Sequence, residues 1–234
     1  MNIKKICYLL IIVVMTCGIL ATSASIAIAN NTDYIVRPGD TMFKIAQAKR
    51  IPTQVLFKAN PQIIDPNYIW QGQKLFIPIR PSNHSDGTFP FKQGTYSPYL
   101  NNYADQRSWS PTGTVTRTHE GIDIFAAAGT PVYASKTGNV FNVGWNLYGG
   151  WRLTIRIDEN MVFYYAHFSA YARNFKLGDR IRQGELIGYV GSTGSGPLGT
   201  AGKFEPHLHF GIYTISPWQA INPYPYLQWW EFQN

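Results

Sequence analysis

The fold of the second half of the chain depends on the segment Glu205-Pro206-His207-Leu208-His209-Phe210. Successive side chains of an extended strand point to opposite faces, so His207 and His209 share one face while Leu208 and Phe210 share the other. The apolar face would enter a core, and the two imidazoles would lie about 6–7 Å apart on the opposite face. One imidazole could bind a metal ion while the other reaches a water or a substrate beside it. A half-exposed strand without chemistry has the same pattern, so other segments are needed to separate the two interpretations.

The first 29 residues have the pattern of an export signal. Lys4 and Lys5 form a positive end, the run Ile6–Ala21 is nearly all apolar, and Ala27-Ile28-Ala29 provides a small-x-small cleavage site. A retained membrane anchor is the alternative, and only in that case would the protein have a membrane partner. We therefore expect a secreted protein that acts in the cell wall or the extracytoplasmic space.

Composition limits the remaining chemistry. Of the 234 residues, 45% are hydrophobic and 14% are charged, which is typical of a folded protein. Both cysteines, Cys7 and Cys17, lie in the signal, so a cleaved protein would have no disulfide, thiolate zinc ligand or cysteine nucleophile. The net charge of +7 favours an anionic surface as partner, and no basic run indicates nucleic-acid binding.

Residues 34–78 predict a small module of strand, helix, helix and strand. This module resembles a LysM domain through Tyr34-x-Val36-x-x-Gly39-Asp40-Thr41, Ile45-Ala46, Asn60-Pro61 and Gly72-Gln73-x-Leu75-x-Ile77-Pro78. The resemblance implies binding of N-acetylglucosamine in peptidoglycan or chitin. The implied sugar contacts are Gly39, Asp40, Thr41, Gln62 and Ile63. Asp40 and Thr41 could instead only cap a helix.

Residues 79–90 have the composition of a linker, in which His84 is expected to be solvated. From residue 91 to residue 228, short β-prone runs alternate with glycines, and no long helical period is present. The sequence therefore predicts an α+β protein in which a β-α-α-β module precedes a mostly antiparallel β domain with an open cleft.

A metal site is predicted in this second domain. His119 and Asp123 would lie about 13 Å apart in a straight strand, but Gly121 between them permits a bend that brings them together. With one histidine of the pair His207/His209 they would form a two-histidine, one-carboxylate set, which is typical of catalytic zinc. A structural zinc site or a copper site is the alternative.

His167 is predicted to join this site from the strand 162–167, where Phe163, Tyr165 and His167 would share a face. Tyr165 would then point at the cleft as well. An unligated histidine beside a metal ion can accept a proton from water and stabilise an oxyanion. A surface histidine without a role is the alternative for His167.

At these residues the domain resembles the lysostaphin-type (LytM-like) zinc metallopeptidases of bacterial cell walls. The motifs are His119-x-x-x-Asp123, Gly129-Thr130-Pro131-Val132, Gly138-x-Val140, Ala166-His167, Gly191-Ser192-Thr193-Gly194 and His207-Leu208-His209. The resemblance implies one Zn²⁺ per chain bound by His119, Asp123 and His209, with His167 and His207 as the catalytic pair. It also implies hydrolysis of peptide bonds in peptidoglycan.

The longer loop 195–206 and Tyr148-Gly149-Gly150-Trp151-Arg152 resemble the subgroup of L-Ala–D-Glu endopeptidases from endospore formers. This implies cleavage of the stem peptide, and a location in the forespore or the spore cortex. Arg152 or Lys203 could pair with a stem-peptide carboxylate, or be solubilising charges. The alternatives to this function are a non-hydrolytic wall binder or amidase activator, a cross-bridge or DD-endopeptidase of the same family, and a general secreted protease.

Overall fold

The structure, a computed structural model, describes residues 32–107 and 117–233. The predicted export signal lies outside these ranges. Within them the chain is α+β and most of its regular structure is antiparallel sheet, which confirms the predicted fold class. No helix of this part of the chain is both long enough and apolar enough to cross a membrane.

The predicted strand–helix–helix–strand module is present at the start of the described chain. Its elements are β1 (Thr32–Ile35), α1 (Met42–Ala48), α2 (Thr53–Lys58) and β2 (Lys74–Ile77), with β1 antiparallel to β2. Thr41 is the N-cap of α1, because its Oγ1 accepts a hydrogen bond from the backbone N–H of Lys44 at 3.2 Å. The helices bury Met42, Ile45, Val55 and Leu56.

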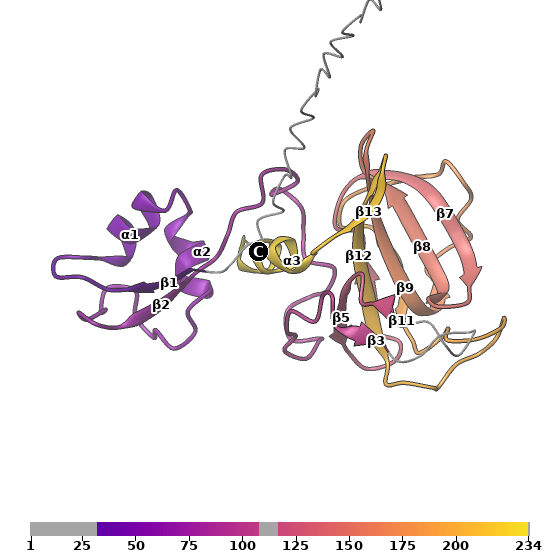
Figure 1. The fold of residues 1–234 in the computed structure, drawn as a ribbon, viewed down its shortest axis with the longest axis horizontal. Helices are drawn as coiled ribbons and strands as arrows, with labels where there is room; N and C mark the ends of the chain where they lie inside the picture. The colour runs from indigo at the N-terminus through magenta and orange to yellow at the C-terminus, as the bar shows by residue number, and fades with distance from the viewer. Residues whose placement is uncertain (1–31, 108–116, 234) are drawn as a thin grey trace, which may run out of the picture. The chain divides into compact units, whose positions relative to one another are not determined.

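The second half of the chain forms one nine-stranded antiparallel sheet, in which β7, β8, β9 and β12 lie side by side (Figure 1). Its strands are β5 (Ile122–Phe125), β6 (Pro131–Tyr133), β7 (Gly138–Asn146), β8 (Gly150–Arg156), β9 (Met161–Tyr171), β10 (Arg180–Ile181), β11 (Leu186–Val190), β12 (His207–Ile215) and β13 (Trp218–Ile221). A separate two-stranded ribbon consists of β3 (Gln106–Arg107) and β4 (Arg117–Thr118).

Strand β12 shows the alternation predicted from its sequence. Leu208, Phe210 and Ile212 are fully buried in the core, and full burial of such side chains stabilises a fold by about 1.5–3 kcal/mol each. His207 and His209 lie on the opposite face, which borders a cleft. Because β12 pairs with both β5 and β9, the histidines lie beside residues from two other strands.

Strand β9 departs from simple alternation at His167. This residue has a φ of +67°, in the left-handed region that non-glycine residues seldom occupy. Between the pairs Leu153–Tyr165 and Trp151–Phe168, β9 has one residue more than β8, which is the definition of a β-bulge. The bulge turns His167 toward the cleft although its predicted companion Tyr165 points into the core.

A C-terminal helix was not predicted. Helix α3 (Tyr224–Gln233) buries four side chains, Tyr226, Leu227, Trp229 and Trp230. The Trp230 ring lies 5.6 Å from the Phe163 ring and 6.0 Å from the Phe210 ring, centroid to centroid. The helix therefore packs against the core side chains of β9 and β12.

The expectation that His84 is solvated is wrong. Its side chain is 15% exposed, its Nε2 lies 2.8 Å from Asp158 Oδ2, and its ring contacts Phe163 edge-on. Trp230 Nε1 also donates a hydrogen bond to the His84 carbonyl at 2.8 Å. At this point the predicted linker therefore packs against β9 and α3. The backbone carbonyl groups of His84 and Ser85 accept hydrogen bonds from the indoles of α3.

Candidate metal centre and active site

Three side chains from two strands and the turn before β5 converge on one point. The distance between His119 Nε2 and His209 Nδ1 is 2.9 Å. Asp123 Oδ1 lies 3.0 Å from each of these two nitrogens. Two ligand atoms of a tetrahedral zinc ion with bonds of about 2.0–2.1 Å lie about 3.3 Å apart. The three atoms are therefore placed to within a few tenths of an ångström of a zinc ligand set. They form one metal-binding group among the described residues.

The backbone fixes the tautomer of His119. Its Nδ1 lies 2.8 Å from the carbonyl oxygen of Asn102, and a carbonyl can only accept, so Nδ1 carries the proton and Nε2 presents its lone pair. Asn102 Oδ1 also accepts a hydrogen bond from the backbone N–H of Asp123 at 3.3 Å. Asn102 thus orients two of the three candidate ligands, a role that the sequence did not indicate.

Glycine at position 121 is required for a second reason besides the predicted bend, at which the chain does turn. A Cβ at this position would lie 2.6 Å from Cε1 and Nε2 of His209 and 2.6 Å from the Phe210 carbonyl oxygen. Real Cβ atoms do not approach other atoms so closely, so Gly121 permits the close approach of β12 and of the His209 ring. Gly121 thus leaves space for the His209 ring, in addition to the bend between His119 and Asp123.

His167 and His207 adjoin this centre without being part of the three-atom set. Their ring centroids are 4.7 Å apart, and Phe204 lies 4.6 Å from the first ring and 5.0 Å from the second. Nδ1 of His167 donates to the Thr193 carbonyl at 2.7 Å, and Nδ1 of His207 donates to the Glu205 carbonyl at 2.7 Å. Both rings therefore keep Nε2 as a proton acceptor.

Burial sets the protonation state of these histidines. It lowers the pKa of His209 to about 4, and it also lowers the pKa of His167 and of His207. All three are neutral at pH 7, which is the form that binds metal or accepts a proton. Burial alone would raise the pKa of Asp123, but the adjacent His119 and His209 imidazoles outweigh it and hold the pKa well below its usual range.

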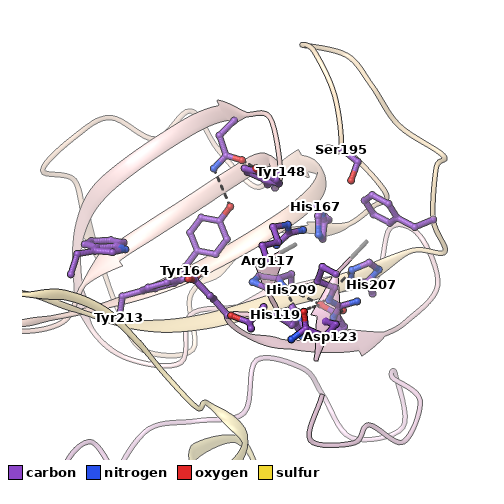
Figure 2. Close-up of a pocket in the computed structure, with 18 residues that line it drawn as sticks. Arg117, His119, Asp123, Tyr148, Tyr164, His167, Ser195, His207, His209 and Tyr213 are labelled. Carbon is purple, nitrogen blue, oxygen red and sulfur yellow. Dashed lines mark hydrogen bonds and ion pairs between the residues drawn. The ribbon is translucent and has the colours of Figure 1, made fainter. Parts of the chain in front are cut away.

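The candidate site lies in an open cleft with a volume of about 640 Å³ (Figure 2). The cleft contains all five residues predicted for metal binding and catalysis. None of the other residues that line it was predicted as a site residue, and the large side chains among them are Arg107, Arg117, Tyr148, Tyr164, Phe204, Tyr213 and Trp218. Phe204 comes from the loop 195–206, so this loop supplies an apolar wall against the two unligated histidines.

Two predicted substrate contacts of this domain, Tyr165 and Arg152, do not line the cleft. Tyr165 is 0% exposed, and its hydroxyl accepts a hydrogen bond from the backbone N–H of Ser135 at 2.9 Å, so it is a core residue. Its neighbour Tyr164 lines the cleft instead, because the bulge reverses the expected relationship between Tyr165 and His167. Arg152 does not line the cleft. The Lys203 ammonium group donates to the Ser195 carbonyl at 2.9 Å.

In the N-terminal module, the residues predicted to bind sugar have structural contacts. Gly39 has a φ of +78°, which a turn there requires, and Asp40 accepts hydrogen bonds from Tyr34 Oη and from the backbone N–H of Arg37. Thr41 caps α1 as described above. Gln62 is exposed, whereas the side chain of Ile63 is buried, so any sugar contact by Ile63 would come from its backbone. Sugar binding by these residues stays a prediction.

Comparison with known protein families assigns two segments of the chain. Residues 34–78 match the LysM domain, and residues 117–223 match peptidase family M23. The chain thus carries a LysM domain followed by a LytM-like domain of peptidase family M23, as the sequence motifs predicted.

Individual relatives agree with this assignment. An L-Ala–D-Glu endopeptidase of Bacillus subtilis is 41% identical over 161 residues, which cover 68% of this chain and 48% of the relative. Lysostaphin of Staphylococcus staphylolyticus is 37% identical over 136 residues, which cover 56% of this chain and 26% of the relative. The chain therefore spans about half the length of the first relative and about a quarter of the second. A solved structure of lytM from Ruminococcus gnavus is 35% identical with a TM-score of 0.53, over 62% of this chain and 60% of that chain.

Proposed function

We propose that this protein is an exported zinc-dependent endopeptidase that hydrolyses peptidoglycan, cutting the stem peptide between L-Ala and D-Glu. The observation that supports the reaction class is the convergence of His119 Nε2, Asp123 Oδ1 and His209 Nδ1 beside two histidines whose Nε2 atoms can accept protons. The bond assignment is supported by the similarity to the Bacillus subtilis endopeptidase.

The residues divide the chemistry between them. His119, Asp123 and His209 would hold one Zn²⁺, which supplies a Lewis acid that polarises the scissile carbonyl group. His167 and His207 accept the proton of the attacking water on Nε2 and return it to the leaving amine. Phe204 excludes bulk water from this pair, and this keeps both imidazoles neutral and strengthens their hydrogen bonds to the reacting atoms.

The LysM domain would bind the glycan strand through the loop containing Gly39, Asp40 and Thr41 and the loop containing Gln62 and Ile63. Its role is to raise the local concentration of the peptidase domain at an insoluble substrate. With these two roles the protein would act at the cell wall, outside the cytoplasmic membrane. Expression during sporulation and action on forespore or cortex peptidoglycan are part of the same proposal.

Zymography followed by mass spectrometry tests the proposal. Purified protein should clear peptidoglycan in a gel, lose this activity with a chelator and regain it with Zn²⁺. The digest should contain stem peptides with a new free amine on glutamate. A new amine on glycine or on diaminopimelate would identify a cross-bridge or DD-endopeptidase instead. Absence of clearing with every metal ion tried would indicate a non-hydrolytic binder or amidase activator.

A further inference from the structure

The cleft contains a cationic group for which the proposed mechanism has no use. Arg117, in β4, is half-buried, and its guanidinium carbon lies 4.6 Å from the centroid of the Tyr148 ring. A guanidinium held against an aromatic ring loses much of its freedom and presents its N–H edge in a fixed direction. Figure 2 shows Arg117 and Tyr148 in the same cleft as the histidines.

The charge of Arg117 is not neutralised within the part of the chain that the structure describes. It forms no ion pair there, and its Nε is buried without a hydrogen-bond partner. An unpaired buried donor is costly, so such a group in a cleft indicates a missing acceptor. The opposite strand adds a second positive charge beside Arg117. Arg107 lies directly opposite Arg117 in the β3–β4 ribbon, and like charges in that position destabilise a strand pair.

Among the residues that the structure describes, Arg107 has an anionic partner and Arg117 does not. Arg107 is paired with Asp123 at 2.7 Å, so Asp123 is committed to it and to the metal centre. The other carboxylate of the cleft, Glu120, acts on Tyr213: burial first, and then the negative charge of Glu120, raises the pKa of the Tyr213 hydroxyl. Neither carboxylate is paired with Arg117 among the described residues, so its guanidinium is available to an anionic group of a bound ligand.

The position of Arg117 defines which carboxylate would fit. It precedes the candidate ligand His119 by two residues, which in an extended segment places it on the same face about 6–7 Å away. In a stem peptide the D-glutamate continues through its side-chain carboxyl group, so its α-carboxylate remains free on the carbon that bears the scissile nitrogen. A substrate bound for cleavage between L-Ala and D-Glu would thus bring a carboxylate within a few bonds of the metal centre.

We propose that Arg117, held by Tyr148, is a specificity-determining residue that binds the free α-carboxylate of the glutamate on the leaving side of the scissile bond. This inference rests on the proposed function. It predicts that the enzyme distinguishes stem peptides with glutamate at this position from those in which the α-carboxyl group is amidated. In this proposal Arg117 takes the role of pairing with a stem-peptide carboxylate, for which the sequence had suggested Arg152 or Lys203.

The test compares two synthetic stem peptides that differ only in this group, the free acid and its α-amide, as substrates of the full-length zinc-loaded enzyme. The wild type should cleave the acid with a kcat/KM about 10- to 100-fold higher than that of the amide, because a charge-assisted bidentate contact is lost in the amide. Arg117→Met should lower kcat/KM for the acid by this factor and leave the amide nearly unchanged. Cleavage of the amide by the variant also demonstrates that it is folded and loaded with metal.

Arg182→Met is the matched control, because Arg182 is an exposed arginine outside the cleft, and it should keep the wild-type ratio. Arg117→Lys should retain an intermediate preference, since lysine keeps the charge without the planar fork. Equal cleavage of both peptides by the wild type would overturn the carboxylate site while leaving the proposed function intact. So would an unchanged ratio in Arg117→Met.

Binding measurements separate this proposal from the proposed reaction. Isothermal titration of the zinc-loaded protein with the dipeptide γ-D-Glu–L-Lys and with its α-amide should show the same preference for the acid, and Arg117→Met should abolish it. If neither stem peptide is cleaved, the proposed function fails, and the titration still decides on Arg117: preference for the acid supports the site, and equal affinities refute it.

Discussion

Arg107 Nη2 lies 2.7 Å from Asp123 Oδ2, while the other oxygen of the same carboxylate lies 3.0 Å from both His119 Nε2 and His209 Nδ1. One carboxylate thus divides its oxygens between a guanidinium and the metal centre. The guanidinium fixes the plane of the carboxylate and keeps Oδ1 directed at the other two candidate metal ligands. Partners of this kind orient metal ligands in many sites.

Arg107→Met should therefore weaken zinc binding by about 10- to 100-fold, the usual effect of removing a partner of a metal ligand. Competition with a chromophoric chelator measures the affinity, with Arg182→Met as the control for loss of a surface charge. Removing a positive charge near Zn²⁺ acts in the opposite direction. Tighter zinc binding in Arg107→Met would show that repulsion, and not orientation, dominates at this position.

The two groups of histidines should separate by their effects on metal content and on turnover. His167→Ala and His207→Ala should keep close to one zinc ion per chain and lose hydrolysis by about 10²- to 10⁴-fold, the usual contribution of a general acid or base. His119→Ala should lose the metal as well. Elemental analysis after dialysis, together with assays on soluble stem peptides, checks both parts. Loss of zinc from His167→Ala would assign that histidine to the metal centre.

Tyr164 and Tyr165 are adjacent in β9 and should respond in opposite ways to the same change. Tyr165→Phe removes the acceptor for the buried Ser135 N–H, which should destabilise the fold by about 1–3 kcal/mol without changing KM. Tyr164→Phe removes a hydroxyl group that lines the cleft and accepts a hydrogen bond from Asn146. It should change hydrolysis with little effect on stability. Thermal unfolding measures the stability of both variants, and peptide hydrolysis measures their activity. The reverse pattern would show that Tyr165, and not Tyr164, faces the cleft.

These two tyrosines also show the limit of prediction from the sequence. Alternation is a reliable guide in β12, where each residue follows strand geometry, and it correctly separated His207 and His209 from the buried Leu208 and Phe210. It fails in β9 because His167 has a positive φ, which no local pattern of residues marked. The histidine was placed on the correct side for an incorrect reason, and Tyr165 was misplaced with it.

Other features were missed because they depend on distant contacts. The pairing of Arg107 with Asp123 joins residues of two separate strands, and nothing in the surrounding sequence of either residue indicates it. Helix α3 was missed because aromatic residues are weak helix formers and Pro225 suggests a break. Pro225 lies in the first turn, where a missing backbone N–H costs nothing, and burial of the tryptophans supplies the stability that propensity does not.

The contribution of α3 can be measured through Trp230, which is fully buried between the rings of Phe163, Phe210 and Tyr226. Trp230→Ala should destabilise the peptidase domain by about 3–5 kcal/mol, as for other large buried aromatic residues. Denaturant unfolding followed by tryptophan fluorescence gives the value. The exposed Trp218→Ala is the control for loss of an indole, and it should cost much less. Equal effects of the two changes would show that α3 does not stabilise the sheet.

Gly121 provides the most direct test of the geometry of the metal centre. In Gly121→Ala the new Cβ would meet the His209 ring and the Phe210 carbonyl oxygen, both at 2.6 Å. The carbonyl is fixed in β12, so the His209 ring is the group that has to move, and Nδ1 then leaves the position that completes the set with His119 and Asp123. Zinc affinity should fall by at least about tenfold, as expected when a ligand is misoriented.

Gly129→Ala is the matched control for this change. Gly129 has a φ of +85° and open space at its Cβ position, so alanine there strains the backbone by about 1–2 kcal/mol without touching the metal centre. Both variants should therefore lose thermal stability, but only Gly121→Ala should lose zinc affinity in the chelator competition. If Gly121→Ala binds zinc as tightly as the wild type, then His209 Nδ1 does not need the position seen here, and the third ligand of the proposed zinc site has to be sought elsewhere, first at His207.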